Sequence, residues 1–392
     1  MLLFCNLFGF AQSLIFVLQP ILLKNTKLEV ADLNQTLAVG SALFLIGTPT
    51  WLKIKRKVGS CTALIIALCF FAFSHALVGV LIWDELPWLL EIYAPVILLS
   101  SRIFYGIGAS GIVLVVQARA SDIADAEVRL KLLQKISAHL ILGRIIGPVI
   151  ALPLLWIWPP LTILLVLVLS LCVGSSLCKL RKKEHESFGA SAQQYKKMRA
   201  LRPFVTYLRP YLIMAAILQS LVGVVQFIFG IWLMETLQWK AENAAIFTGG
   251  LLMSCGVLIA LTQLYIKPTA KIFLSVLRIL TLTLVLLGLS LFAFRSVFLF
   301  SAFNVAVIVT AALWAPTYLH AAIERANGIR NDSITTVVAM THTIAYSLTG
   351  IVSGYLYQWN EHSIFFIAAM MCIVAFYISN QILISFTQSV NT

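Results

Sequence analysis

Two arginines lie in the middle of long apolar runs, and their chemistry is hard to explain as packing alone. Arg102 lies within the run 92–118 and Arg144 within the run 132–157, at a depth where neither run carries Asp or Glu. A guanidinium in an apolar span needs backbone carbonyls, water or a bound anion as its partner. Its planar fork suits carboxylate and phosphate. These arginines therefore predict a site for a small organic anion; for Arg102 the alternative is a structural role, with helix carbonyls and water as partners.

Three histidines also lie in apolar runs, at His75, His139 and His342. A single histidine in such a run is often a packed or hydrogen-bonded residue, but imidazole can exchange a proton near neutral pH. His342 belongs to a polar stretch and His139 lies near Arg144. We expect His342 or His139 to take part in proton coupling, with Glu235 as a third candidate.

Further polar and aromatic side chains lie in runs that could surround a central cavity. Ligand pockets combine apolar and aromatic walls with a few polar groups. Helix–helix hydrogen bonding is the alternative role for each of these residues. The sequence predicts that the two arginines share the substrate site with Gln12, Gln226, Asn304 and Trp314.

The composition decides which elements must position these residues. The chain has 392 residues, of which 60% are hydrophobic and 11% charged, with a mean hydropathy of +0.96. Soluble domains have about 25% charged residues. A membrane span needs about 20 apolar residues and must form its backbone hydrogen bonds internally. We therefore expect an all-α polytopic membrane protein with twelve spans, near 2–23, 35–52, 60–83, 92–118, 132–157, 160–178, 210–234, 242–265, 272–294, 296–318, 333–357 and 363–386.

The basic residues are divided unequally between the two sides of these spans. Lys and Arg number 28 against 15 Asp and Glu, which gives a net charge of +13. Most of them fall in even-numbered connections, including Lys267, Lys271 and Arg278, whereas Lys24 and Lys240 are among the few in odd-numbered ones. The positive-inside rule then places both termini and the even-numbered connections in the cytoplasm. We expect the chain to lie in the inner (cytoplasmic) membrane. The positive charge therefore does not indicate nucleic-acid binding.

The one long polar segment, 179–209, divides the chain into two nearly equal parts. We expect an N-terminal six-helix bundle at 1–178, a cytoplasmic linker at 179–209 and a C-terminal six-helix bundle at 210–392. Two bundles joined by a long central loop are the plan of many secondary transporters. No phosphate loop, dinucleotide fingerprint, catalytic triad or metal-ligand spacing is present. We therefore expect no enzyme activity, no catalytic residue, no cofactor and no metal.

Small residues recur at every fourth position in the fifth span, in the pattern G-x-x-x-G-P-x-x-A at 143–151. Gly143 and Gly147 would permit close approach of a neighbouring helix. Pro148 removes a backbone hydrogen bond and permits a kink. Plain tight packing is the alternative to a role in coupling.

Residues 102–151 resemble the major facilitator superfamily, in particular its twelve-helix proton-coupled efflux branch. The fourth span has R-x-x-x-G-x-G at 102–108, the next loop has D-x-x-x-x-x-x-R from Asp122 to Arg129, and the fifth span is close to the antiporter pattern G-x-x-x-G-P-x-x-G-G. The loop after the second span departs from the family pattern G-x-x-x-D-R-x-G-R-R, because Arg56 replaces the acid and the arginine pair is absent.

The resemblance implies two six-helix halves of the major facilitator fold, with alternating access to a site between them near mid-membrane. It implies coupling or gating roles for Gly143, Gly147, Pro148, Asp122 and Arg129. With the two arginines, it predicts proton-coupled export of a small organic anion, such as a carboxylate siderophore or related metabolite. Multidrug efflux and uptake of an anionic nutrient or siderophore are the alternatives.

The expected partners are the small-molecule substrate, protons and the lipid bilayer, with no nucleic acid and a single copy of the chain. A membrane enzyme or a receptor that transports nothing is the alternative from another class. It would require a catalytic constellation that the sequence lacks.

Overall fold

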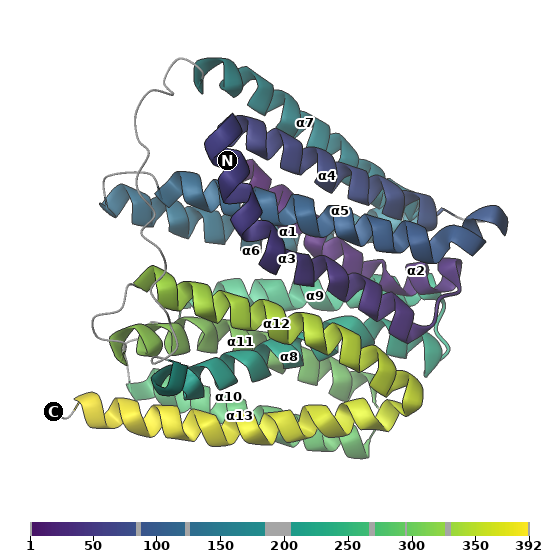
Figure 1. Cartoon of the computed structure of the whole chain (residues 1–392). Coiled ribbons are helices and arrows are strands. Elements are labelled where there is room, and N and C mark those ends of the chain that lie inside the picture. The colour runs from purple at the N-terminus through teal and green to yellow at the C-terminus, as the bar shows by residue number, and fades with distance from the viewer. Residues whose placement is uncertain are drawn as a thin grey trace. The chain divides into compact units, whose positions relative to one another are not determined.

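The computed structural model describes residues 2–83, 88–121, 126–184, 205–265, 271–294, 296–325 and 331–390, and within these ranges every regular element is an α-helix (Figure 1). The all-α prediction is confirmed. The helices are α1 (Leu2–Val17), α2 (Gln19–Thr26), α3 (Val30–Val58), α4 (Ser60–Leu81), α5 (Trp88–Ser121), α6 (Ala126–Ile157), α7 (Pro160–Glu184), α8 (Val205–Glu235), α9 (Ala241–Tyr265), α10 (Lys271–Ala293), α11 (Val297–Arg325), α12 (Asn331–Trp359) and α13 (Glu361–Val390).

Eleven of the described helices are long and apolar enough to cross a membrane, and the bent pair α1 and α2 makes up to twelve spans. This pair corresponds to the first predicted run, and its two helices meet at 53°. Pro20, in the first turn of α2, lacks an N–H and cannot continue the hydrogen-bond pattern of α1. The apolar run 2–23 is therefore continuous in sequence, although the structure divides it between two helices.

Several helices extend beyond the predicted runs into charged sequence. α3 continues to Val58 and carries Lys55 and Lys57 in its last turn, where cations interact favourably with the helix dipole. Arg278 lies inside α10, and not in a connection as the distribution of charge predicted. Of the predicted linker 179–209, residues 185–204 lie outside the described residues.

Large apolar side chains face outward on many helices. Trp156 is 85% exposed, Trp359 81% and Phe298 79%. Water would solvate such a surface poorly, whereas lipid chains are as apolar as these side chains. The exposure therefore agrees with the spans counted by length and hydropathy.

The chain divides into two compact units, and the first contains the described helices α1–α7 together with Gly230–Gly256. In this unit α4 packs against α5 and α7, and α1 packs closely against α6 (Figure 1). A Cβ atom at Gly9 would meet the carbonyl oxygen of Leu140, and one at Gly143 would meet that of Asn6. Glycine at these positions therefore allows the two backbones to cross with almost no side chain between them.

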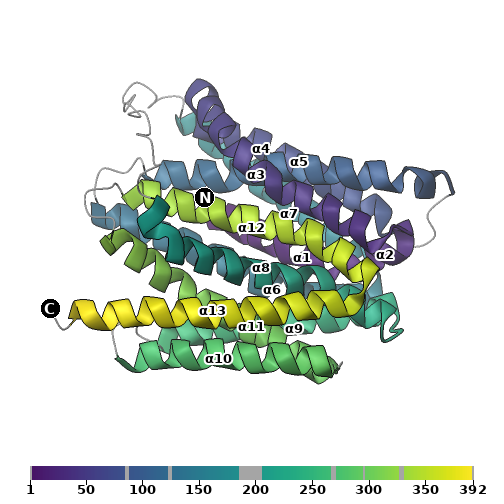
Figure 2. The same ribbon diagram turned by 60° about the horizontal axis from the view of Figure 1, so that its bottom comes forward.

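The second unit contains α8 up to Phe229, α9 from Val257, and α10–α13. Here α10 packs against α11 and α13, and Figure 2 shows α10 and α13 side by side. A hydrogen bond joins these two helices, from Arg278 Nε to Asn380 Oδ1 at 2.6 Å. Phe300 packs edge-on against Phe229 and Phe365 in the core of this unit.

Candidate functional site

Arg144 and Gln12, two of the predicted site residues, are in direct contact. The guanidinium donates from Nε and from Nη2 to the same oxygen, Gln12 Oε1, at 3.1 and 2.8 Å. The glycine crossing of α1 and α6 brings together these residues, which lie 132 positions apart. Arg144 is nevertheless exposed, within the candidate span Ala138–Ile157. The two hydrogen bonds to Gln12 therefore orient the exposed guanidinium group of Arg144.

Arg102 lies in α5 and is 2% exposed. Its Nε donates to Ser101 Oγ at 3.2 Å, and Nη2 has no hydrogen-bond partner among the described residues. The guanidinium carbon lies 4.8 Å from the centre of the Tyr105 ring, in a cation–π contact. A buried charge is costly unless it is compensated, and the ring face offers only part of that compensation. Arg102 therefore places a buried and only partly compensated positive charge in α5.

Tyr105 lies between Arg102 and α1. Arg102 lies over its ring face, and the ring stacks at 6.5 Å on that of Phe8, one turn before Gln12. The sequence reasoning did not assign Tyr105 to the site, although its spacing of three residues from Arg102 places both on one side of a helix. The three helices α1, α5 and α6 thus supply an amide, a phenol and two guanidiniums to one cluster, which we call the arginine cluster (Gln12, Arg102, Tyr105 and Arg144).

The hydrogen bonds from Arg144 to Gln12 and from Arg102 to Ser101 have neutral acceptors. Arg144 donates to an amide oxygen and Arg102 to a hydroxyl oxygen. By contrast, an ion pair within the same unit joins Lys24 Nζ to Glu242 Oε1 at 2.6 Å, between α2 and α9. A cluster with several N–H donors and neutral acceptors is suited to oxyanions, particularly carboxylates.

The other three predicted substrate residues lie in the second unit. Gln226 Oε1 accepts a hydrogen bond from the Tyr346 hydroxyl at 2.7 Å, between α8 and α12. Asn304 and Trp314 are buried in α11, and within the described ranges Asn304 Oδ1 and Trp314 Nε1 have no hydrogen-bond partner. The structure therefore does not bring Gln226 into a hydrogen bond with either of these two atoms.

The predicted proton-coupling residues have different surroundings. His342 Nε2 lies 2.6 Å from the Tyr318 hydroxyl, across α12 and α11. His139 Nδ1 lies 2.8 Å from the Lys135 carbonyl oxygen, one turn earlier in α6. The contact of His342 therefore links two helices, whereas that of His139 stays within one. Nothing in the sequence around Tyr318 distinguished it from an ordinary core aromatic.

The predicted coupling and gating residues lie on α6 or before it. Gly143 and Gly147 both face α1, where a Cβ at Gly147 would meet Ser13 Oγ and the Phe10 carbonyl oxygen. Pro148 is buried, and α6 continues through it as one helix. Asp122 lies outside the described residues. Arg129 lies in α6, and the structure describes only its backbone.

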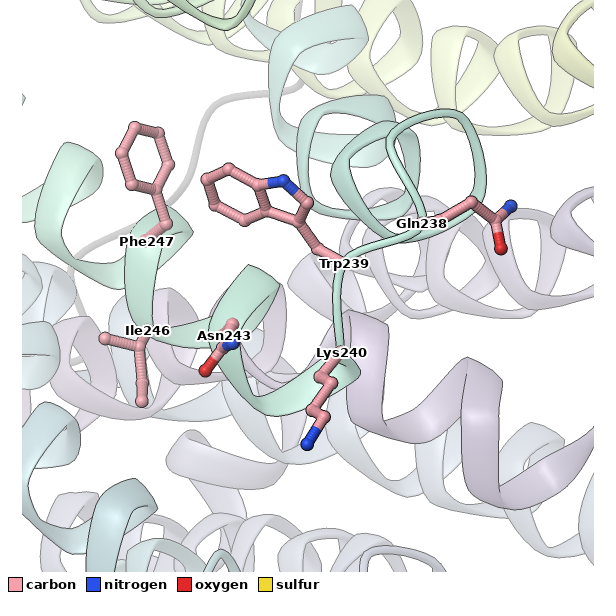
Figure 3. Close-up of a pocket in the computed structure, with 6 residues that line it drawn as sticks. All are labelled: Gln238, Trp239, Lys240, Asn243, Ile246 and Phe247. Atoms are coloured by element: carbon pink, nitrogen blue, oxygen red, sulfur yellow. The ribbon is translucent and has the colours of Figure 1, made fainter.

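A separate pocket of about 620 Å³ lies where α8 passes into α9 (Figure 3). It is lined by Gln238, Trp239, Lys240, Asn243, Ile246 and Phe247. The rings of Trp239 and Phe247 meet edge to face at 5.4 Å, while the side chain of Lys240 extends away from them (Figure 3). It contains none of the predicted site residues and is distinct from the arginine cluster.

Comparisons with known proteins identify the family from the sequence and the fold from solved structures. A family model described as Major Facilitator Superfamily matches residues 1–337. A search of curated proteins finds no match. Among solved structures, a D-xylose-proton symporter has a TM-score of 0.68 at 17% identity, with 96% of this chain and 95% of that chain covered.

Two further solved structures show the same fold. A POT family transporter in complex with a thioalcohol conjugated peptide has a TM-score of 0.67 at 15% identity, with 100% of this chain and 96% of that chain covered. A mutant of the nucleoside transporter NupG has a TM-score of 0.69 at 11% identity, with coverage of 97% and 98%. At such identities the likeness extends to the fold and not to the substrate.

Proposed function

Because the chain belongs to the major facilitator superfamily of secondary transporters, we propose that it carries a small organic anion across the bilayer by alternating access. The observation that carries this proposal is the Arg144–Gln12 contact. It holds an accessible guanidinium within a candidate span against a neutral amide oxygen, in the same unit as the buried Arg102. An anion is the natural counter-charge for such a group.

The chemistry of the cluster favours a carboxylate over a hydrophobic cationic drug. Two guanidiniums repel a cation, whereas they can each donate to a carboxylate oxygen. The Tyr105 ring adds an aromatic surface beside them. A carboxylate siderophore or a related metabolite has both features, and multidrug efflux becomes the weaker alternative.

The direction of transport has two candidates. The glycine and proline pattern at 143–151 resembles that of proton-driven exporters and supports export. Uptake is supported by a different observation: the four members of the arginine cluster include two cations and no acid. An exporter driven by proton entry needs proton and substrate to displace one another, whereas a proton and an anion bind favourably together at a cationic site.

The proposal includes the placement of the chain in the cytoplasmic membrane. Both termini and the even-numbered connections would lie in the cytoplasm, and one copy would suffice for transport. The halves would be 1–178 and 210–392 with the linker 179–209 between them. His342, His139, Gly143, Gly147, Pro148, Asp122 and Arg129 would couple proton movement or gate access to the substrate.

Transport into proteoliposomes tests the anion proposal. The probes are labelled citrate, succinate, benzoate and phosphate, measured under inward and outward pH gradients. We expect the wild type to carry at least one carboxylate, and Arg144→Gln to reduce its rate by about tenfold or more, as expected from losing charged hydrogen bonds of about 1.5–3 kcal/mol.

Arg278→Gln is the matched control. Arg278 is also an exposed arginine in a span and also bonds an amide, Asn380, but it belongs to α10 of the second unit. It should keep the wild-type rate. A wild type that carries none of these anions, or an Arg144→Gln protein with unchanged rate and normal gel filtration, would overturn the proposal. The sign of the pH gradient that drives accumulation decides between export and uptake.

A further inference from the structure

His75 is a buried histidine beside the arginine cluster to which the sequence assigned no role. It lies in α4 and is 2% exposed. Its Nδ1 is 2.8 Å from the Phe71 carbonyl oxygen. Since a carbonyl oxygen only accepts hydrogen bonds, Nδ1 carries the hydrogen. Nε2 is buried and has no hydrogen-bond partner among the described residues, so the neutral ring presents an unused lone pair there.

Aromatic rings surround His75 and connect it to the arginines. Its ring centre lies 4.4 Å from that of Phe71 and 6.0 Å from that of Tyr105. Tyr105 also carries Arg102 over its ring face and stacks on Phe8, one turn before Gln12 in α1. Tyr105 therefore lies between the buried imidazole and the helix that holds Gln12.

The charged group that the structure places beside His75 is the guanidinium of Arg102. Of the elements packed against α4, α5 presents Tyr105, whose ring centre lies 6.0 Å from that of His75, and Arg102 over the Tyr105 ring. The described charged residues of the other elements packed against α4 are Lys24 in α2 and Asp32, Lys53, Lys55, Arg56 and Lys57 in α3, and α7 contributes the thiol of Cys172.

We propose that His75 Nε2 is a proton-binding site of the transporter, and that its proton and the anion at the arginine cluster bind together. This inference rests on the proposed anion site. A proton on Nε2 would make His75 a further cation beside Arg102, next to a cluster whose members include no acid. A bound anion would supply the counter-charge.

Proton binding at His75 and anion binding at the arginine cluster must affect one another equally, which determines how the anion affinity changes with pH. If the anion favours protonation of His75, protonation favours the anion by the same factor. The anion therefore binds more tightly at low pH and more weakly at high pH. A proton and an anion that bind together move in the same direction, so this inference favours proton-driven uptake over export.

Proton movement and anion affinity are measured together in proteoliposomes that contain a pH-sensitive dye. The probe is the carboxylate from the panel above that the wild type carries fastest. In the wild type we expect acidification of the lumen during uptake, and an anion affinity about tenfold tighter at pH 5.5 than at pH 7.5. His75→Gln should lose both the acidification and the pH dependence, whereas His362→Gln at the start of α13 should keep both.

A complementary variant replaces His75 by a smaller amide. His75→Asn keeps a side-chain N–H that can donate to the Phe71 carbonyl oxygen but has no group that titrates near neutral pH. This variant should also lose the acidification and the pH dependence of the anion affinity. It also provides the test if His75→Gln fails to fold.

The outcomes separate the two proposals. A wild type that carries none of the anions overturns the anion site and this inference with it. An anion that is carried with the same pH dependence in His75→Gln as in the wild type overturns the role of His75 and leaves the anion site intact. Retention of the wild-type pH dependence in His75→Asn also overturns the role of His75.

Discussion

A single oxygen, Gln12 Oε1, accepts both hydrogen bonds that orient the Arg144 guanidinium. An amide in this position leaves the cation with its full charge, whereas a carboxylate would neutralise it. The choice of glutamine over glutamate is therefore a condition for anion binding at this site. The same reasoning applies to any arginine whose charge must remain available to a ligand.

Gln12→Glu should strongly reduce anion transport while preserving the fold. The carboxylate would form a bidentate ion pair with Arg144 and compete with the substrate. Uptake of the labelled carboxylate into proteoliposomes measures the effect, with an expected loss of about tenfold or more, as for removal of charged hydrogen bonds. Asn380→Asp makes the same change beside Arg278 and should keep the wild-type rate. Equal rates in wild type and Gln12→Glu would contradict the proposed role of the pair.

The sequence located the arginines of the cluster more readily than the aromatic residues. Arg102 and Arg144 stand out because a charge is rare in an apolar run. Tyr105 and Tyr318 do not stand out, since aromatic residues at helical spacing are usually core residues. The contact between Arg144 and Gln12 depends on how α1 and α6 cross, and neither residue type nor spacing contains that information.

At the scale of elements, the crossing of α1 and α6 is what positions the cluster. Gly9 and Gly143 place backbone against backbone, so the distance between these helices leaves no room for a side chain at either residue. The sequence predicted a smooth stripe on the fifth span. It could not predict that the first span packs against this stripe. Small residues show that some helix can approach closely, but they do not show which helix it is.

Gly143→Ala should destabilise the protein, because the new methyl group would meet the backbone of α1 at Asn6. Overpacking of this kind costs about 1–3 kcal/mol. Thermal unfolding of the purified protein should show a lower midpoint temperature. Gly250→Ala in α9 is the matched control, since a Cβ there meets nothing within 4 Å. If both variants unfold at the wild-type temperature, the crossing is looser than described.

The bend between α1 and α2 illustrates a different limit of sequence reasoning. Hydropathy reports one continuous run at 2–23, while the helix turns by 53° within it. Pro20 marks the place, but a proline in a span can also be accommodated without a break, as Pro148 and Pro153 are in α6. The difference depends on neighbouring contacts and not on the run itself.

At the scale of the whole molecule, the distribution of basic residues determines the proposed orientation. The number of spans followed from length and hydropathy, which need only local sequence. Sidedness follows from charges in the connections, several of which lie outside the described residues. Orientation therefore needs an experiment that reports on which side of the membrane a given residue lies.

Cysteine labelling of intact cells should reveal this orientation. In a background without native cysteines, Asn360→Cys between α12 and α13 should react with a membrane-impermeant maleimide. Lys57→Cys at the end of α3 should react only after the membrane is permeabilised, because the positive-inside rule places it in the cytoplasm. Both native residues are exposed. The reverse labelling pattern would invert the proposed topology.

The ion pair between Lys24 and Glu242 is exposed on both sides, with 52% and 38% of the side chains accessible. Exposed pairs contribute little to stability, about 0–1 kcal/mol. Screening of this pair by dissolved salt should therefore change the stability little. An exposed guanidinium such as Arg144, by contrast, attracts an anion through a field that falls off over about 8 Å at physiological ionic strength. Raising the salt concentration would therefore weaken substrate capture and leave the thermal stability of the protein nearly unchanged.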